Sequence, residues 1–325
     1  MVGCDCLNNE NNIIKKIPLI VVCGPTASGK TSLGIALAKH YNGEIISADS
    51  MQIYKGMEIA TAKPTEEEQQ RIIHHLISYV EPTQSYSVAD YVKTAHNKIR
   101  EINNKGKTPI LVGGTGLYVN SLLNNIEFSE SNTDTELRKE LYNRLEKEGA
   151  ESLLNELAEF DEKSAERIGT TNHRRLIRAI EIYRTTGKTM TQHINDSMLV
   201  PSPYNDVRIG LTCNDRQKLY DKINKRVDVM VESGLIEEAE NFRNQKYSAT
   251  AVKAIGYKEL EPYFTGSTSL ETALENLKRE TRRYAKRQLT WFRRDEKINW
   301  LFTDEMTSEE LIEKAIAIID KSNIL

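Results

Sequence analysis

The sequence predicts an α/β protein, in which a parallel sheet is covered by helices on both faces and an all-helical domain is inserted into the chain. Three observations support this fold class. Short apolar runs alternate with helical patterns in residues 18–128, which is typical of a parallel sheet. Residues 129–200 contain no strand-like run, and an apolar run then restores the sheet pattern. A length of 325 residues leaves room for two domains.

The first half of the sheet is predicted from three short apolar runs and the helices between them. The first strand, PLIVVC at 18–23, is β-branched and ends at a glycine. A helix follows over residues 32–41, and EIISA at 44–48 predicts a second strand. Residues 87–104 carry apolar side chains at helical spacing, and TPILV at 108–112 predicts a third strand.

The second half of the chain begins with the insertion. Residues 129–200 are rich in charged helix formers, as in ELRKELYNRLEKEG, and two prolines mark their end. VRIGLT at 207–212 restores a strand, and INWLF at 298–302 predicts a last one. Helices are predicted at 215–233, 235–245, 270–290 and 307–321. The predicted division is a flexible lead at 1–17, a catalytic core of 18–128 and 201–325, and a helical insertion domain at 129–200.

Composition and charge exclude several classes of protein. The chain is 39% hydrophobic and 28% charged, which suits a globular core and not wholesale disorder. No apolar run approaches the roughly 18 residues of a transmembrane helix, so we expect no membrane partner. The first 16 residues lack the apolar stretch of a signal peptide, and the four cysteines make no disulfide scaffold. We therefore expect a cytoplasmic protein, and a monomer.

A phosphate-binding loop is predicted at GPTASGKT, residues 24–31, which match G-x-x-x-x-G-K-[ST] between a predicted strand and a predicted helix. In such a loop the backbone N–H groups point at a phosphate, and the following helix adds its dipole. Lys30 supplies a mobile charge, and Thr31 a hydroxyl that can hold Mg²⁺. The alternative is a glycine-rich turn with a chance lysine, but the flanking elements favour a P-loop NTPase-like sheet. The motif alone does not establish phosphoryl transfer. The predicted diphosphate- or nucleotide-binding residues are Gly24, Pro25, Thr26, Ala27, Ser28, Gly29, Lys30 and Thr31.

Two further polar sites follow strands and should reach the same edge of the sheet. Asp49 lies just past the second strand, and Thr115 follows the third after two glycines. Carboxyl ends of parallel strands line the ligand crevice, so both residues can face the phosphate loop. The plainer readings are that Asp49 caps a helix or supports a Mg²⁺ ion from its second shell, and that Thr115 caps the next helix.

Basic residues are concentrated in two stretches, although the net charge is only −3. Residues 278–294 hold eight Lys or Arg against one Glu, and residues 172–188 are also basic. This distribution fits a bound polyanion. Trp291 and Phe292 lie within the first stretch, where they either stack on bases or pack into the core.

Several motifs in a fixed order carry a resemblance. After GPTASGKT come DSMQIY, TAKP, YSVADY, VGGTGLY, NHRRLIRAIE, AIGYKEL and KRQLTWFRRD. Over about residues 18–302 the chain resembles the bacterial tRNA dimethylallyltransferases, the IPP transferase family, which prenylate N6 of the adenosine that follows the anticodon. Ala60 stands where the family pattern has glycine, and Lys253 where relatives often carry glutamine or arginine.

The resemblance implies a role for each matching residue. The phosphate loop would hold the diphosphate of dimethylallyl diphosphate, with Mg²⁺, instead of ATP. Asp49 would accept the proton from the adenine amine, with Lys30 and Thr115 beside the reacting groups. The partner would be the anticodon stem-loop of tRNA. The positions that match the family's tRNA contacts are Asp49, Ser50, Met51, Gln52, Thr115, Arg138, Arg174, Arg175, Leu176, Ile177, Arg178, Lys253, Ala254, Ile255, Gly256, Tyr257, Lys258, Lys286, Arg287, Gln288, Leu289, Thr290, Trp291, Phe292 and Arg293.

Three other functions remain open from the sequence. A prenyltransferase acting on a free adenine nucleotide would share the phosphate loop, Asp49 and Thr115, but would need neither the insertion nor the basic stretches. A small-molecule P-loop kinase would turn over ATP. A non-catalytic RNA-binding module would not need an intact phosphate loop with Asp49.

Overall fold

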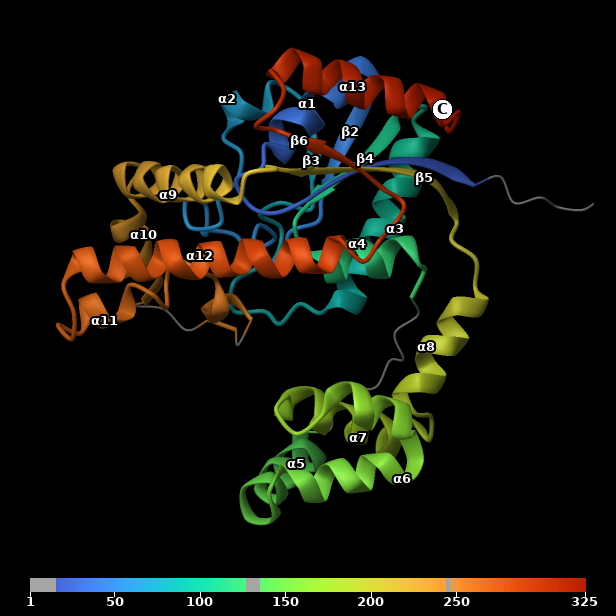
Figure 1. Ribbon diagram of the computed structural model, residues 1–325, viewed down its shortest axis with the longest axis vertical. Coiled ribbons are helices and arrows are strands. Elements are labelled where there is room, and N and C mark those ends of the chain that lie inside the picture. Colours follow the sequence, from blue (N-terminus) through green and yellow to red (C-terminus); the bar gives the residue numbers. More distant parts are fainter. Residues whose placement is uncertain (1–15, 127–134, 244–246, 249) are drawn as a thin grey trace, which may run out of the picture. The chain divides into compact units, whose positions relative to one another are not determined.

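The computed structural model describes residues 16–126, 135–243, 247–248 and 250–325. It divides into two compact units, one formed by residues up to 120 together with 203–325, and the other by 121–202 (Figure 1). The predicted lead at 1–17 lies outside the described residues except for its last two. The smaller unit, which we predicted as residues 129–200, starts at Ser121 and ends at Ser202.

The larger unit is built on one parallel sheet of six strands in the order β3-β2-β4-β1-β5-β6. The strands are β1 (Ile17–Cys23), β2 (Gly43–Ser47), β3 (His74–His75), β4 (Thr108–Gly113), β5 (Tyr204–Thr212) and β6 (Ile298–Phe302). Five of them follow the prediction. The edge strand β3 was not predicted, because two residues carry no periodic signal.

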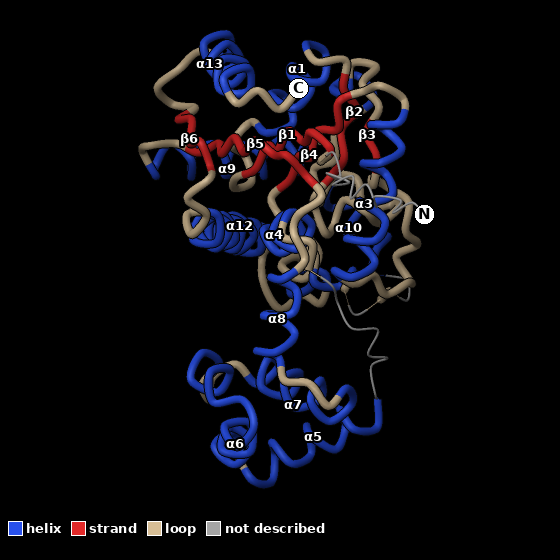
Figure 2. Tube along the Cα trace, turned by 90° about the vertical axis from the view of Figure 1, so that its right-hand side faces the viewer, coloured by secondary structure: helices blue, strands red, loops and turns tan. Residues whose placement is uncertain are grey.

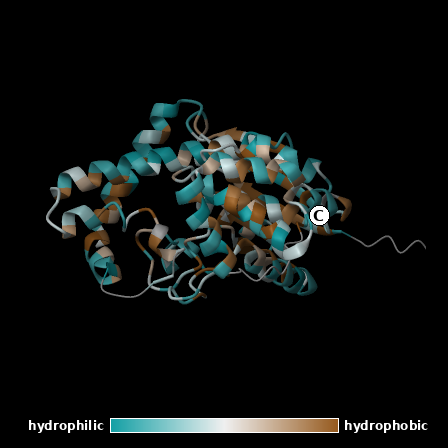
Figure 3. Ribbon diagram, turned by 90° about the horizontal axis from the view of Figure 1, so that it is seen from below, coloured by the Kyte–Doolittle hydropathy of each residue, from teal (hydrophilic) through white to brown (hydrophobic). Residues whose placement is uncertain are grey.

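Helices cover both faces of this sheet, as predicted (Figure 2). On one face, α1 and α13 pack on the sheet through Leu33, Leu37, Ala315 and Ile319. On the other face, α3 packs against β2 and β4. Apolar residues gather inside the unit, as the hydropathy colouring shows (Figure 3). The helices are α1 (Lys30–His40), α2 (Glu66–Gln69), α3 (Val88–Asn104), α4 (Gly116–Leu123), α9 (Arg216–Glu232), α10 (Leu235–Arg243), α11 (Glu261–Phe264), α12 (Leu270–Phe292) and α13 (Ser308–Lys321), with a 3₁₀ turn at Ala251–Lys253.

Local sequence signals explain where several of these helices begin. Ser87 accepts a hydrogen bond from the backbone N–H of Asp90, whose carboxylate accepts one from the N–H of Ser87. Thr307 and Glu310 form the same capping box at α13. Each box satisfies N–H groups that the first helical turn leaves unpaired.

A second core lies within the larger unit, away from the sheet centre. It joins α9, α10 and α12 to the loop that follows β2, through residues such as Ile53, Met57, Val227 and Leu277. This packing fixes the loop and the helices as one wall around the carboxyl end of the sheet.

The smaller unit is all-helical in its described part, as the sequence predicted. Its helices are α5 (Thr135–Glu148), α6 (Ala150–Ile168), α7 (His173–Thr186) and α8 (Met190–Leu199). Their apolar faces form one core that includes Leu141, Leu157, Leu176 and Ile180. None of the helices in the described ranges of either unit is long and apolar enough to cross a membrane.

Candidate active site

The phosphate loop, residues 24–31, connects β1 to α1 at the carboxyl edge of the sheet. Gly24 has φ +140°, and a Cβ there would lie 2.2 Å from the carbonyl oxygen of Leu211, so only glycine fits. The carbonyl oxygen of Pro25 accepts hydrogen bonds from Ser28 Oγ at 2.9 Å and from Lys30 Nζ. The loop is thus closed on itself between β1 and the N-terminus of α1, and this strand–loop–helix order is the one that the sequence predicted.

Two cations meet beside this loop. The protein atoms packed around Lys30 lower its pKa to about 8, and the positive charge of Arg226, on α9, adds to this effect. Burial also lowers the pKa of Arg226. The negative charge of Asp49 opposes both shifts. Two poorly solvated cations that repel each other form a site that an anion would stabilise.

Asp49 stands at the predicted place, two residues after β2, and faces these cations. Its Oδ1 accepts hydrogen bonds from the backbone N–H groups of Met51, at 2.9 Å, and Gln52, at 3.4 Å. Its other oxygen, Oδ2, makes no hydrogen bond to the described part of the chain. Asp49 therefore caps the turn that follows it, and not a helix as in the plainer reading, and it keeps one oxygen free for chemistry.

Thr115 and Ser50 hold the ends of β4 and β2 together. The backbone N–H of Ser50 donates to Thr115 Oγ1 at 3.0 Å, and the Thr115 N–H donates to the carbonyl of Ala48 at 3.0 Å. The hydroxyl of Tyr284, on α12, interacts with the side chains of Thr115 and Gln288, and burial raises its pKa. Thr115 thus lies beside Asp49, as expected.

Lys30, Asp49, Ser50, Arg226 and Tyr284 line one cavity of about 300 Å³ at the carboxyl edge of the sheet, whereas Thr115 is not among its lining residues. One part of its wall is polar and includes Thr26, Lys30, Thr31, Asp49 and Arg226. Another part is apolar and comes from α9, α10 and α12, through Ile223, Val227, Met230, Leu235 and Leu277. The cavity can therefore hold a ligand that is anionic at one end and hydrocarbon at the other.

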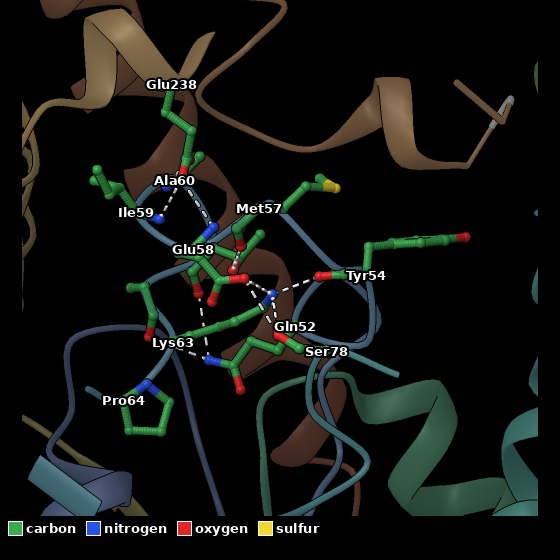
Figure 4. Close-up of polar contacts among 12 residues, drawn as sticks. Gln52, Tyr54, Met57, Glu58, Ile59, Ala60, Lys63, Pro64, Ser78 and Glu238 are labelled. Atoms are coloured by element: carbon green, nitrogen blue, oxygen red, sulfur yellow. Dashed lines mark hydrogen bonds and ion pairs between the residues drawn. The ribbon is translucent and has the colours of Figure 1, made fainter. Parts of the chain in front are cut away.

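Residues 58–62 form a loop whose last three residues line the cavity wall, and one carboxylate holds the backbone of this loop (Figure 4). Glu238 accepts hydrogen bonds from the backbone N–H groups of residues 58, 59 and 60 at 2.8–2.9 Å. Lys63 lies below it and donates to Glu58, Ser78 and the carbonyl of Tyr54. Ala60, the departure from the family pattern, lies in this wall, where its backbone is one of the three donors.

Helix α12 divides the predicted RNA-contacting stretch into two faces. Lys286, Arg287, Thr290 and Arg293 are exposed, whereas Leu289 is half-buried. Phe292 is buried at 3% exposure, and half-buried Trp291 packs on Gly116. The two aromatic residues therefore follow the second of the two predicted alternatives, packing within the fold. The buried Gln288 points inward, where its Oε1 accepts the backbone N–H of Thr26 in the phosphate loop and its side chain lines the cavity.

The other predicted RNA-contacting stretches are also mixed in exposure. Arg174 and Arg175 are exposed on α7, whereas Leu176 and Ile177 are core residues of the smaller unit. Ala254 and Tyr257 are buried in the larger unit, because Tyr257 packs on α10 and donates to Glu238. Ile255, Gly256 and Lys258 line the cavity. Lys253 lies in the 3₁₀ turn, and its side chain is outside the described residues.

A Mg²⁺ ion would find few protein ligands here. Among the residues that the structure describes, no group of three or more His, Cys, Asp or Glu side chains could hold a metal. The hydroxyl of Thr31 lines the cavity and has no hydrogen bond to any described residue. Mg²⁺ in other proteins often has only one or two protein oxygens as ligands, so Mg²⁺ at Thr31 stays a prediction.

Cys23 is the last residue of β1, directly before the phosphate loop. Its side chain is 1% exposed, and burial raises the pKa of its thiol to about 12. Cys4 and Cys6, noted in the sequence, lie outside the described residues.

Sequence reasoning missed Arg226 and Glu238 and misjudged Gln288. All three lie on the apolar faces of their helices. Arg226 lies between Ile223 and Val227, Glu238 lies beside Leu235 and Ala239, and Gln288 lies between Ala285 and Phe292. A charged or amide side chain within an apolar stripe must find a buried partner, and this signal would have identified them.

Comparison with known proteins places the chain in a family. A model of the IPP transferase family matches residues 52–295. The tRNA dimethylallyltransferase of Acetivibrio thermocellus is 52% identical over 91% of this chain and 95% of its own. The Bacillus subtilis protein of that name is 48% identical over 93% and 96% of the two chains.

Comparison with solved structures leads to the same family. The full-length tRNA isopentenylpyrophosphate transferase of Bacillus halodurans is 43% identical, with a TM-score of 0.70 over 94% of this chain and 98% of that chain. A eukaryotic dimethylallyltransferase acting on tRNA is 29% identical, with a TM-score of 0.82 over 94% and 79%. With a matching model over most of its length and relatives near half identity, this chain belongs to the IPP transferase family.

Proposed function

We propose that the protein transfers a dimethylallyl group from dimethylallyl diphosphate to N6 of the adenosine 3′ of the anticodon in tRNA, releasing diphosphate. The observation that carries this proposal is the cavity at the carboxyl edge of the sheet, where paired cations meet an apolar wall. Relatives named for this reaction support it over most of the chain. In this proposal the protein acts in the cytoplasm and is a monomer.

The two ends of the cavity suit the two ends of the donor. The loop amides, Lys30 and Arg226 complement a diphosphate, while Val227, Met230 and Leu277 complement a branched five-carbon chain. A nucleoside triphosphate would have to place its base and ribose against that apolar wall. The cavity therefore favours a prenyl diphosphate over ATP.

Asp49 acts as the general base. The N6 lone pair of adenine is delocalised into the ring, so the amine is a weak nucleophile. As N6 bonds to C1 of the donor, the free Oδ2 of Asp49 takes the N6 proton. The hydrogen bonds from the N–H groups of Met51 and Gln52 hold the carboxylate in place through Oδ1.

The leaving group departs toward the cations. The C1–O bond breaks as the N6–C1 bond forms, and the electron pair goes to the diphosphate. Lys30, Arg226 and those loop amides that are not bonded within the protein would stabilise this growing negative charge. Mg²⁺, held by Thr31 and the diphosphate oxygens, would supply further charge neutralisation.

The RNA contacts would come from the exposed basic side chains. These are Lys286 and Arg287 on α12, Arg293 directly after it, and Arg174 and Arg175 on α7, which can bind the phosphates of the anticodon stem-loop. The target base must leave the loop stack to reach Asp49, which costs a few kcal/mol and is least costly in a loop.

One experiment separates this function from its alternatives. The protein is incubated with radiolabelled dimethylallyl diphosphate and either tRNA or free AMP, and ATP hydrolysis is measured in parallel. Label in tRNA, with ATP neither required nor consumed, is the expected result. Label in AMP would indicate a free-nucleotide prenyltransferase, ATP hydrolysis alone a kinase, and RNA binding without either a non-catalytic module.

A further inference from the structure

The side chain of Gln288 connects two of the loops that form the cavity. It lies on α12 and is 5% exposed. Its Oε1 accepts a hydrogen bond from the backbone N–H of Thr26, in the phosphate loop, at 2.9 Å. Its Nε2 donates to the carbonyl oxygen of Gly114, after β4, at 2.9 Å. One amide thus joins the end of β1 to the end of β4.

The contact is close because Gly114 has no side chain. A Cβ at this position would lie 2.3 Å from Nε2 of Gln288, so the amide could not reach the carbonyl past any other residue. The next residue, Thr115, accepts the N–H of Ser50 at 3.0 Å, and Ser50 follows Asp49. A continuous series of hydrogen bonds therefore runs from the donor loop, through Gln288 and residues 114–115, to the loop of the general base.

We propose that Gln288 is a positioning residue that sets the distance between the phosphate loop and the Asp49 loop. This inference rests on the function proposed above, because it assumes that the donor binds one loop and the attacking nitrogen meets the other. Gln288 itself lines the cavity, but its two polar side-chain atoms are bonded to the backbone on either side of the place where the reacting groups would meet. It acts by holding the backbone groups on either side of them.

The chemistry of the side chain explains why this position requires an amide. Two of the neighbours of Gln288 at helical spacing, Ala285 and Phe292, are buried and apolar, and a third, Tyr284, has its hydroxyl in contact with the amide. A polar group here is costly unless it is fully bonded. A carboxylate could accept from Thr26 but could not donate to Gly114. An apolar side chain could do neither, and would leave a buried N–H and a buried carbonyl unpaired.

The first test compares Gln288→Met with the parent. Methionine keeps the length and volume of the side chain but removes the hydrogen bonds to Thr26 and Gly114, together with the interaction with the Tyr284 hydroxyl. We expect kcat to fall by about 10²-fold, because a misplacement of about 1 Å can cost that much. KM for dimethylallyl diphosphate and for tRNA should stay within about threefold, since the binding groups remain. Gln217→Met, at an exposed position on α9, is the matched control and should leave kcat unchanged.

The second test uses pH with Gln288→Glu. When the glutamate is ionised, one of its negatively charged oxygens faces the carbonyl oxygen of Gly114 and repels it. When the glutamate is protonated, it can accept the N–H of Thr26 and donate its O–H to the carbonyl of Gly114, as the glutamine does. The ratio of its kcat to that of the parent should therefore rise as the pH falls from about 7 to about 5. A residue that only fills space would show no such rescue.

The outcomes separate the two proposals. A parent protein that transfers no label to tRNA refutes the proposed function, whatever the variants do. If the parent is active, a Gln288→Met variant with parental kcat, or a Gln288→Glu ratio that does not depend on pH, overturns this inference alone. Should Gln288→Met fail to fold by circular dichroism, the pH ratio of Gln288→Glu decides.

Discussion

Arg138 on α5 donates from Nη2 to Oε2 of Glu181 on α7 at 2.6 Å, across 43 residues of sequence. Arg178, one turn before Glu181, donates to the same oxygen at 3.0 Å. The carboxylate is completely buried, whereas both arginine side chains are about one-third exposed. One buried anion therefore holds two basic side chains that stand at predicted tRNA contacts.

Glu181→Gln should destabilise the smaller unit by about 1–3 kcal/mol, since it leaves two neighbouring guanidinium groups without their shared charge. Thermal and urea unfolding would measure this loss. In a double-mutant cycle with Arg138→Met, the two losses should not add, because they remove the same contact. The exposed Glu166→Gln on α6 is the control, and an equal loss there would contradict the role of Glu181.

Asp49→Asn should lower kcat by about 10²–10⁴-fold, the usual effect of removing a general base. The amide oxygen can still accept the N–H groups of Met51 and Gln52, so folding and tRNA affinity should change little. Single-turnover transfer and a separate tRNA-binding measurement would check this. A kcat within fivefold of the parent would show that another group takes the proton.

The affinity for the donor should depend on pH through Lys30. Its pKa lies at about 8, so the side chain is charged below pH 8 and increasingly neutral above it. Since the charged form of Lys30 binds diphosphate, kcat/KM for the donor should decline above about pH 8. Bound diphosphate stabilises the charged form, so the decline in kcat should occur at higher pH. Lys30→Arg, which stays charged, should remove this limb of the profile even if its overall rate is low. A limb that persists in the variant would assign it to another group.

The exposed face of α12 should contribute phosphate contacts. Among the residues that the structure describes, Lys286 and Arg293 have no ion-pair partner. Changing both to Gln should weaken tRNA binding and reduce the slope of log K against log salt by about one to two units. The effect should be similar for every substrate tRNA, because phosphates carry no sequence information. The double variant K314Q/K321Q, on α13, removes equal charge from the opposite face of the sheet and should leave the slope unchanged.

Most of the fold could be predicted because its signals are local. The apolar strand runs, the glycines at strand ends and the capping residues each appear within a few neighbouring positions. The edge strand β3 could not be predicted from the sequence, because its pairing with β2 depends on tertiary packing and not on a sequence pattern of its own.

The site was predicted less completely. The phosphate loop and Asp49 were found because each follows a strand in a recognisable motif. Arg226, Glu238 and the inward direction of Gln288 were not found, because their partners lie far away in sequence; Gln288 and Thr26 are 262 residues apart. The same helical stripe that marks α12 as amphipathic also determines which of its polar residues turn inward, and that information was present in the sequence.

The sulfur atom of Cys23 has a practical consequence for work with this protein. A thiol with a pKa of about 12 is almost entirely protonated at neutral pH, and only the thiolate reacts readily with oxidants and alkylating reagents. The strand that carries the phosphate loop is therefore chemically inert at this position. Cysteine-directed reagents should therefore react slowly with Cys23, although it directly precedes the phosphate loop.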